Sequence, residues 1–203
     1  MSEKTQLLYK LFSYPFFYSI TQKLMSGEKK RATLVQNIIK ENSTILDIGC
    51  GTGKIIEALP NVKYFGFDIN KIYINFAKKK YKNKNINFFC KKFTSKDLKK
   101  LPKFDFVLLF GIMHHLTDFE INQLLNLINK NLKKNGTILT FDPVYVKKQN
   151  FIARFLIRND VGENVRFANQ YVNILKKIFR KINYQIDNQN FIPYNWFISK
   201  INK

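Results

Sequence analysis

Short apolar runs alternate along the chain with longer segments in which apolar positions recur every three or four residues. The runs with the length and composition of buried strands are Ile45–Ile48, Val62–Asp68, Ile86–Cys90, Phe104–Phe110 and Thr137–Asp142. The pattern predicts a helix over Lys54–Leu59 and another after Asn70, whose side chain suits the capping position. Strands that alternate with helices predict a parallel sheet that is covered on both faces.

The segment before the last of these strands carries the most complete helix pattern. Thr117 and Glu120 have the spacing of a capping box. An apolar stripe follows, formed by Ile121, Leu124, Leu125, Ile128 and Leu132. The pair Asn135-Gly136 is predicted to end this helix, because glycine readily adopts the left-handed conformation common at helix ends.

The C-terminal part has a different pattern. A helix is predicted over Gln170–Phe179. Two strand-like runs follow, "YQID" and "FIPYNWFIS", joined by "NQN", and they predict an antiparallel hairpin. Because no internal repeat, low-complexity linker or shift in composition divides the chain, residues 1–203 are predicted to form a single domain.

The loop after the first strand contains alternating glycines, Gly49, Gly51 and Gly53. Glycine at a strand-to-helix turn permits otherwise strained dihedral angles and lets a ligand approach the backbone. The dinucleotide fingerprint has the spacing GxGxxG, whereas this loop has GxGxG and an acid, Asp47, before its first glycine. In parallel sheets ligands bind beyond the carboxyl ends of the strands, which is where this loop is expected to lie.

The stretch "LDIGCGTG" resembles the first motif of class I methyltransferases, which use S-adenosylmethionine. This cofactor has no phosphate, so the loop must fit a nucleoside and an amino-acid tail. The resemblance covers nearly the whole chain and implies a Rossmann-like, doubly wound α/β fold whose seven-stranded sheet is mostly parallel with a C-terminal antiparallel hairpin. It also implies N-terminal helices or a lid in residues 1–43, a cofactor-binding core in 44–142, and substrate-side helices with the hairpin in 143–203.

The same resemblance assigns residues to the parts of the cofactor. Those implied to line it are Gly49, Cys50, Gly51 and Gly53, with Asp47 near its methionine portion, Asp68 and Ile69 at the ribose and adenine edge, and Phe110 and Gly111 facing the sulfonium. Arg31 is a further candidate, for the cofactor carboxylate.

One position departs from the family pattern. After the third strand the family often places an acid that holds the adenine amino group, but this chain has Lys92 and Phe93 there. Phe93 is therefore expected to pack on the adenine ring, and Asp97 lies further along the chain.

The stretch "GIMHHL", Gly111 to Leu116, resembles the fourth motif common among small-molecule methyltransferases and differs from the Asn-Pro-Pro-Tyr type used on nucleic-acid bases. Methyl transfer to an acceptor that must lose a proton needs a base, and a histidine side chain titrates near neutral pH. His114 and His115 are therefore the candidate catalytic residues. The alternative is that they cap the adjoining helix or pack beneath the loop.

The stretch "ARFLIRNDVGENVRFANQYVNIL" resembles a bacterial branch of small-molecule methyltransferases with a D-x-G-x-x-V-R pattern, matched by Asp160, Gly162, Val165 and Arg166. In this fold the region after the fifth strand lies over the site, so Asp160, Arg166 and Tyr171 are predicted to contact the acceptor. Alternatively, Asp160 and Arg166 form a structural ion pair.

The N-terminal segment contains the aromatic residues Tyr9, Phe12, Tyr14 and Tyr18. They are interpreted either as a lid or as residues that pack against the sheet.

The chain is strongly basic, with 35 Lys and Arg against 14 Asp and Glu and a formal net charge of +21. Such an excess would attract nucleic acid, anionic lipid or acidic metabolites. The alternative is a compositional origin, since Lys, Asn, Ile, Phe and Tyr all have AT-rich codons, and the scatter of the lysines favours this interpretation.

With two cysteines, no CxxC pair and no apolar span long enough for a bilayer, the sequence predicts a cytoplasmic protein without a disulfide framework or metal site.

These features predict an enzyme that transfers a methyl group from S-adenosylmethionine to a small-molecule acceptor. Two alternatives stay open: an RNA-directed methyltransferase, and a non-catalytic basic binding protein that keeps the fold. The sequence does not identify the acceptor, the nucleophilic atom or the oligomeric state.

Overall fold

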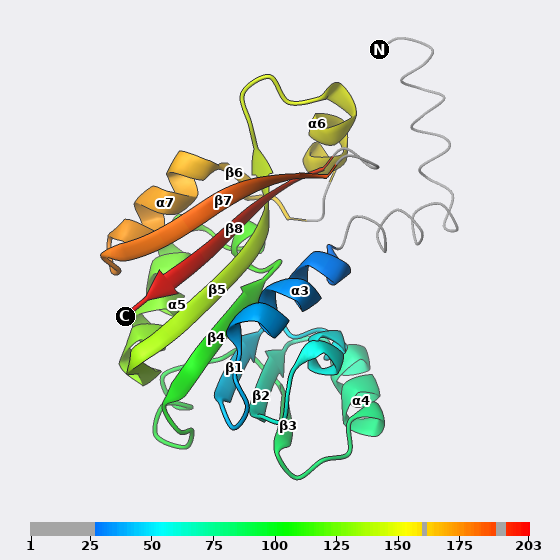
Figure 1. Cartoon of the computed structure of the whole chain (residues 1–203), viewed down its shortest axis with the longest axis vertical. Helices are drawn as coiled ribbons and strands as arrows, with labels where there is room; N and C mark the ends of the chain where they lie inside the picture. Colours follow the sequence, from blue (N-terminus) through cyan, green and yellow to red (C-terminus); the bar gives the residue numbers. More distant parts are fainter. Residues whose placement is uncertain (1–26, 160–161, 190–193) are drawn as a thin grey trace.

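The computed structural model describes residues 27–159, 162–189 and 194–203, which form one central sheet with helices on both faces (Figure 1). The strands are β1 (Thr44–Ile48), β2 (Lys63–Asp68), β3 (Ile86–Cys90), β4 (Phe104–Phe110), β5 (Leu132–Tyr145), β6 (Arg166–Phe167), β7 (Lys181–Gln189) and β8 (Tyr194–Asn202). Their order in the sheet is β3-β2-β1-β4-β5-β8-β7, and the short β6 pairs with β5 outside this path. Strands β1 to β5 are parallel, whereas β8 is antiparallel to both of its neighbours. The predicted sheet and C-terminal hairpin are confirmed, with β6 as an additional strand.

The helices form one layer on each face of the sheet (Figure 1). One apolar core includes residues of α3 (Glu28–Ile38), α4 (Lys71–Lys80) and α6 (Phe151–Arg158), and the other includes residues of α5 (Asp118–Asn131) and α7 (Ala168–Lys176). Because the middle strands are covered on both faces, every residue of β1 is buried. This double covering explains why the central strands read as continuous apolar runs in the sequence.

The carboxyl ends of β1, β2 and β4 meet at one edge of the sheet. Strand β1 lies between β2 and β4, with Ile48 paired to Phe67 and Asp47 paired to Leu108. The Gly49 and Cys50 amides both donate to the Phe67 carbonyl, at 2.8 and 3.1 Å, which turns the chain out of the sheet. The glycine loop therefore lies at the edge where parallel sheets bind their ligands.

Several predicted element boundaries are wrong. The segment expected to form an α-helix over Lys54–Leu59 is a 3-10 helix, η1 (Lys54–Ala58). Helix α5 ends at Asn131, not at Asn135-Gly136, because Leu132 already pairs with Phe104 as the first residue of β5. The helix expected over Gln170–Phe179 is α7, which begins and ends earlier, and β7 begins before "YQID".

Some predictions concern residues outside the described ranges. These include the N-terminal aromatic residues, Asp160, and Asn190 of the predicted "NQN" turn. The other two residues of that turn, Asn188 and Gln189, belong to β7 instead, where they pair with Asn195 and Tyr194. Among the helices in the described ranges, none has both the length and the apolar character that crossing a bilayer requires.

Candidate active site

The glycine loop has the left-handed backbone that its sequence predicts. Gly49, Gly51 and Gly53 have φ angles of +76°, +54° and +72°. A Cβ built on Gly53 would lie 2.9 Å from the Phe88 ring, so this glycine is required for packing. A Cβ built on Gly51 would meet nothing within 4 Å. The exposed backbone at Gly51 therefore has open space beside it, as a ligand-binding loop requires.

A cavity of about 460 Å³ opens beside this loop. Its lining includes Asp47, Gly49, Cys50 and Gly51 from the end of β1, Phe110 from the end of β4, and Arg31 from α3. Five of the residues predicted to bind the cofactor are thus brought together at one cavity. Arg31, which the sequence offered only as a further candidate, lies with them.

Asp47 is a buried acid on the wall of this cavity. Its carboxylate accepts a hydrogen bond from the Tyr64 hydroxyl at 2.5 Å. Burial raises the pKa of Asp47 to about 7, although the Tyr64 hydrogen bond and the positive charge of Arg31 oppose the shift. Asp47 is therefore poised to gain or lose its charge near neutral pH according to what occupies the cavity.

Arg31 brings a cation to the same cavity. Its guanidinium lies 4.9 Å from the centre of the Phe141 ring, and its buried Nε has no hydrogen-bond partner. Burial lowers the pKa of Arg31, and the nearby charges of Asp142 and Asp47 oppose this shift. A buried N–H donor without an acceptor is costly, so this arrangement favours an anionic or hydrogen-bond-accepting group in the cavity.

Asp68 supports the loop from the end of β2. Its Oδ2 accepts from the Gly51 amide and its Oδ1 from the Asn70 amide, both at 2.8 Å. Each carboxylate oxygen has a second lone pair, so Asp68 keeps the capacity to accept further hydrogen bonds. Ile69 follows it and is 75% exposed, while Gly111 follows Phe110 with a φ of +67° beside Arg31.

Phe93 lies elsewhere. It is buried in the core on the α5 face, edge-on to Phe67 with ring centres 5.3 Å apart. It lines a second cavity of about 580 Å³, together with Ile112 and Leu124. The structure therefore does not bring Phe93 to the cavity at the glycine loop.

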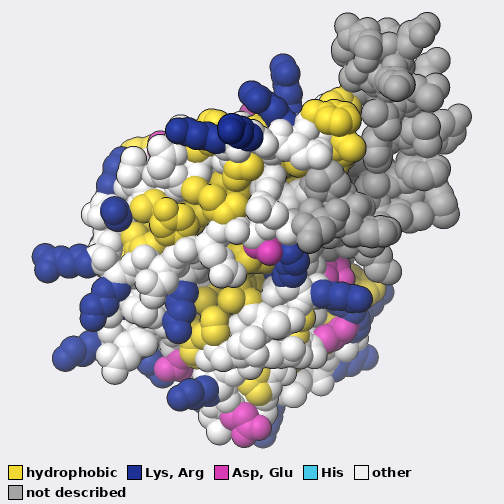
Figure 2. Space-filling view, turned by 45° about the horizontal axis from the view of Figure 1, so that its top comes forward, with side chains coloured by type: hydrophobic (Ala, Val, Ile, Leu, Met, Phe, Trp, Pro, Cys, Tyr) yellow, Lys and Arg dark blue, Asp and Glu magenta, His cyan; other side chains and the backbone are white. Residues whose placement is uncertain are grey.

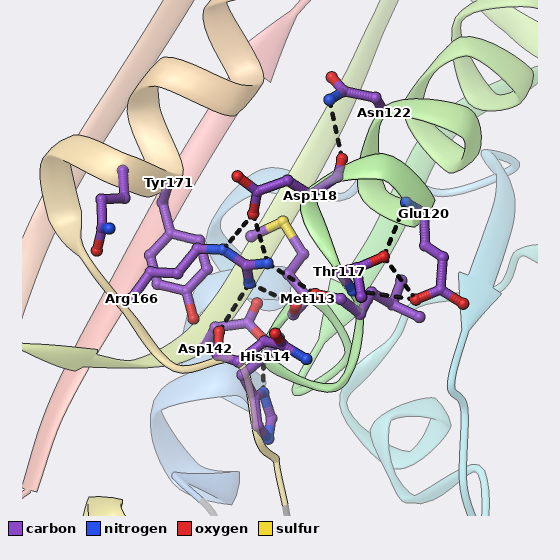
Figure 3. Close-up of polar contacts among 12 residues, drawn as sticks. Met113, His114, Thr117, Asp118, Glu120, Asn122, Asp142, Arg166 and Tyr171 are labelled. Carbon is purple, nitrogen blue, oxygen red and sulfur yellow. Dashed lines mark hydrogen bonds and ion pairs between the residues drawn. The ribbon is translucent and has the colours of Figure 1, made fainter.

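His114 and Asp142 form a buried pair (Figure 3). His114 lies in η2 (Met113–His115), and its Nδ1 is 2.8 Å from Asp142 Oδ1, which also accepts from the His114 amide at 3.2 Å. A carboxylate oxygen accepts hydrogen bonds, so the pairing assigns an N–H to Nδ1 of His114. His115 is exposed, with its ring centre 4.1 Å from that of His114.

Asp142 was not predicted as a site residue. The available signal was its position at the end of the predicted strand Thr137–Asp142, because an acid there reaches the same edge of the sheet as Asp68. Its Oδ2 is buried without a hydrogen-bond partner, which is a second unsatisfied polar atom near the site.

Two residues predicted to contact the acceptor, Arg166 and Tyr171, form hydrogen bonds with other parts of the protein. Arg166 uses its N–H groups on Asp118, on the carbonyls of Met113 and Leu116, and on Asn164. Tyr171 is buried, and its hydroxyl donates to the Pro143 carbonyl at 3.1 Å. Both side chains thus bond to the protein itself, and their contact with the acceptor stays a prediction. Arg166 does form an ion pair, with Asp118.

The described ranges contain no group of three or more His, Cys, Asp or Glu side chains arranged to hold a metal ion.

Comparison with known proteins identifies relatives of this chain. A family model described as a methyltransferase domain matches residues 39–193. O-methyltransferase 12 of Dictyostelium discoideum is 29% identical over 170 residues, which cover 78% of this chain and 44% of that protein. Ribosomal RNA small subunit methyltransferase A of Mesomycoplasma hyopneumoniae is 26% identical over 163 residues, covering 78% of this chain and 58% of that protein. This chain spans about half the length of these curated relatives.

Solved structures share the fold. One of them is the crystal structure of a SAM-dependent methyltransferase from Archaeoglobus fulgidus, which matches with a TM-score of 0.67 at 20% sequence identity. The match covers 92% of this chain and 100% of that chain. At this identity the match shows that the sheet and its covering helices are shared.

Proposed function

The chain belongs to the methyltransferase domain family, and from this premise we propose that it transfers a methyl group from S-adenosylmethionine to a small-molecule acceptor. The observation that carries the proposal is the buried His114–Asp142 pair behind the cavity of the glycine loop. The pair does not line the cavity, but a Cβ built on Gly111 would lie 3.3 Å from Arg31, which does, and 3.8 Å from the His114 ring. The pair offers a base next to the place where the family binds its cofactor.

The charges around the cavity fit S-adenosylmethionine. The cofactor's amino-acid tail carries an ammonium and a carboxylate, and the cavity offers an acid, Asp47, and a cation with an unpaired N–H, Arg31. Its ribose has two hydroxyls, for which Asp68 retains acceptor capacity. We assign Asp47 to the ammonium, Arg31 to the carboxylate and Asp68 to the ribose, with the open side of Gly51 allowing close approach.

When bound, the cofactor supplies a methyl group activated by a positively charged sulfur. The protein aligns the acceptor for in-line displacement and excludes water, with Phe110 and Gly111 at the end of β4. His114 takes the proton of the acceptor on Nε2, while Asp142 holds the ring by Nδ1 and stabilises the charge that forms. The methyl group ends on the acceptor, and the proton leaves through His114.

A second candidate is an RNA-directed methyltransferase. The ribosomal RNA methyltransferase among the relatives and the net charge of +21 favour it. Against it stands the "GIMHHL" motif, which differs from the type used on nucleic-acid bases. A non-catalytic binding protein has less support, because the glycines, Asp68 and a buried His–Asp pair are all present.

A labelling screen separates these functions. A cell extract is incubated with the protein and methyl-labelled S-adenosylmethionine, with and without ribonuclease. We expect label in a small product that survives ribonuclease and is lost with His114→Ala, which should slow turnover about a hundredfold or more if the acceptor is a hydroxyl. Label that disappears on RNA digestion would contradict the small-molecule proposal, and no transfer to any fraction would favour a binding protein.

A further inference from the structure

The segment 162–167, here called the strap, lies across η2 and holds it against β5. It begins at the buried Gly162 and ends in β6, whose Arg166 and Phe167 pair with Val144 and Tyr145 of β5. These strand residues come just after Asp142. The strap is therefore fixed to the same strand that carries the partner of His114.

The strap contacts His114 directly. The Asn164 amide donates to the His114 carbonyl at 2.9 Å. A Cβ built on Gly162 would lie 1.9 Å from His114 Cδ2 and 2.9 Å from Nε2. No side chain fits at position 162 unless the imidazole moves, so the glycine allows the strap to lie against the ring edge that carries Nε2.

Arg166 holds the other side of η2 (Figure 3). Its Nη1 donates to the Met113 carbonyl at 3.0 Å and its Nη2 to the Leu116 carbonyl at 2.7 Å, so the guanidinium contacts the residues on both sides of the two histidines. Its Nε donates to Asp118 at the start of α5, at 2.8 Å. Since the planar guanidinium has donors in fixed directions, this set of acceptors fixes the loop in one position.

We propose that the strap sets the position of the His114 ring, with Gly162 and Arg166 as positioning residues for methyl transfer. Gly162 limits where the imidazole can lie, and Arg166 fixes the backbone that carries it. Residues Gly162–Arg166 of the tail motif and the "GIMHHL" motif are therefore in direct contact and act together on the His114 ring. The proposal rests on the proposed function only in assigning proton transfer to His114.

Nuclear magnetic resonance tests the positioning without any acceptor. The chain has two histidines, so a His115→Gln variant assigns the ring signals of His114 in the full chain. We expect Gly162→Ala to shift the Cδ2–H and Cε1–H signals of His114 and to change the Nδ1–H signal, because a methyl group 1.9 Å from Cδ2 forces the ring to leave its present position and so disturbs its contact with Asp142. Glu163→Ala is the matched control, since this exposed strap residue should leave the signals unchanged.

Arg166 gives a second test. Arg166→Lys keeps the charge but cannot reach every acceptor, so we expect partial displacement of His114 and a smaller loss than in Arg166→Ala. Binding of S-adenosylmethionine by calorimetry should stay within about twofold in Gly162→Ala and Arg166→Lys, because neither residue lines the cavity. With the acceptor in hand, kcat should fall about tenfold or more in both, with an altered pH profile.

The outcomes separate this proposal from the proposed function. Unchanged His114 signals in folded Gly162→Ala and Arg166→Lys would overturn the positioning role. Shifted signals with an unchanged rate would support the positioning role and count against His114 as the base. Shifted signals with a reduced kcat and unchanged cofactor binding would support both.

Discussion

Asp68 shows how one carboxylate can serve both the protein and a ligand. It holds the amides of Gly51 and Asn70, and the proposed function adds the ribose hydroxyls. We expect Asp68→Ala to weaken S-adenosylmethionine binding tenfold to a hundredfold, since hydrogen bonds to charged groups contribute about 1.5–3 kcal/mol. Calorimetry measures this, and NAD should bind far more weakly than S-adenosylmethionine to the parent protein. An unchanged dissociation constant in a folded variant would restrict Asp68 to ordering the loop.

The proposed contact of Asp47 with the cofactor ammonium predicts that cofactor binding depends on pH. Its pKa of about 7 means that the carboxyl is largely protonated at pH 6 and ionised at pH 8. The ammonium of S-adenosylmethionine favours the ionised form, so binding releases a proton and affinity rises as pH rises through 7. We expect the dissociation constant to be roughly tenfold larger at pH 6 than at pH 8, by linkage.

Two variants control this measurement. Asp47→Asn should bind more weakly at pH 8 and lose the pH dependence. Tyr64→Phe removes the hydrogen bond that lowers the pKa of Asp47, so the transition should move to higher pH. If the pH dependence persists in Asp47→Asn, another group is responsible and the assignment to the ammonium is wrong.

At the scale of elements, the capping box of α5 is a local feature that the sequence predicted and the structure confirms. The Glu120 amide donates to Thr117 Oγ1 at 3.3 Å, and the Thr117 amide donates to Glu120 Oε2 at 3.0 Å. We expect Thr117→Ala to lower the free energy of unfolding by about 1 kcal/mol and the melting temperature by about 2–4 °C. Thr117→Ser keeps the hydroxyl and should retain most of the stability. Equal melting temperatures for Thr117→Ala and the parent would show that the box contributes nothing here.

Local sequence patterns predicted the structural features that depend mainly on residues close together in the sequence. The strands β1 to β4, the helix caps at Asn70 and Thr117, and the glycine turn all follow from short stretches of sequence. The end of α5 could not be predicted in this way, because Leu132 continues the apolar stripe of the helix and also begins β5. Its assignment depends on Phe104, which lies on another strand.

The same distinction between local and long-range contacts separates the parts of the candidate site that could be predicted from those that could not. The glycine loop and Asp68 belong to one contiguous motif, whereas His114 meets Asp142 and Arg166 meets Asp118 across large separations in sequence. The members of each pair lie on different elements, and the tertiary fold brings those elements together. For this reason the sequence predicted a contact between Arg166 and the acceptor but not the ion pair between Arg166 and Asp118.

At the scale of the whole molecule, the sheet brings the loops after β1, β2 and β4 and Asp142 of β5 to one edge, so the cavity of the glycine loop and the His114–Asp142 pair lie close together. On the face shown in Figure 2, the Lys and Arg side chains have no such concentration. Figure 2 shows Lys and Arg side chains spread around the displayed face, with apolar and uncharged side chains between them. A defined RNA track would place them along one stripe.

Scattered cations give RNA binding that is weak, sequence-independent and sensitive to salt. We expect the affinity for a labelled random-sequence RNA, measured by fluorescence anisotropy, to fall roughly a thousandfold between about 50 and 200 mM salt. Charge reversal at the exposed pairs Lys99/Lys100 and Lys147/Lys148 should weaken binding about equally, because neither pair belongs to a dedicated surface. Methyl transfer to a small acceptor should persist at the higher salt concentration. Binding that survives 200 mM salt, or that one lysine pair alone abolishes, would identify a specific RNA surface and favour the RNA-directed function instead.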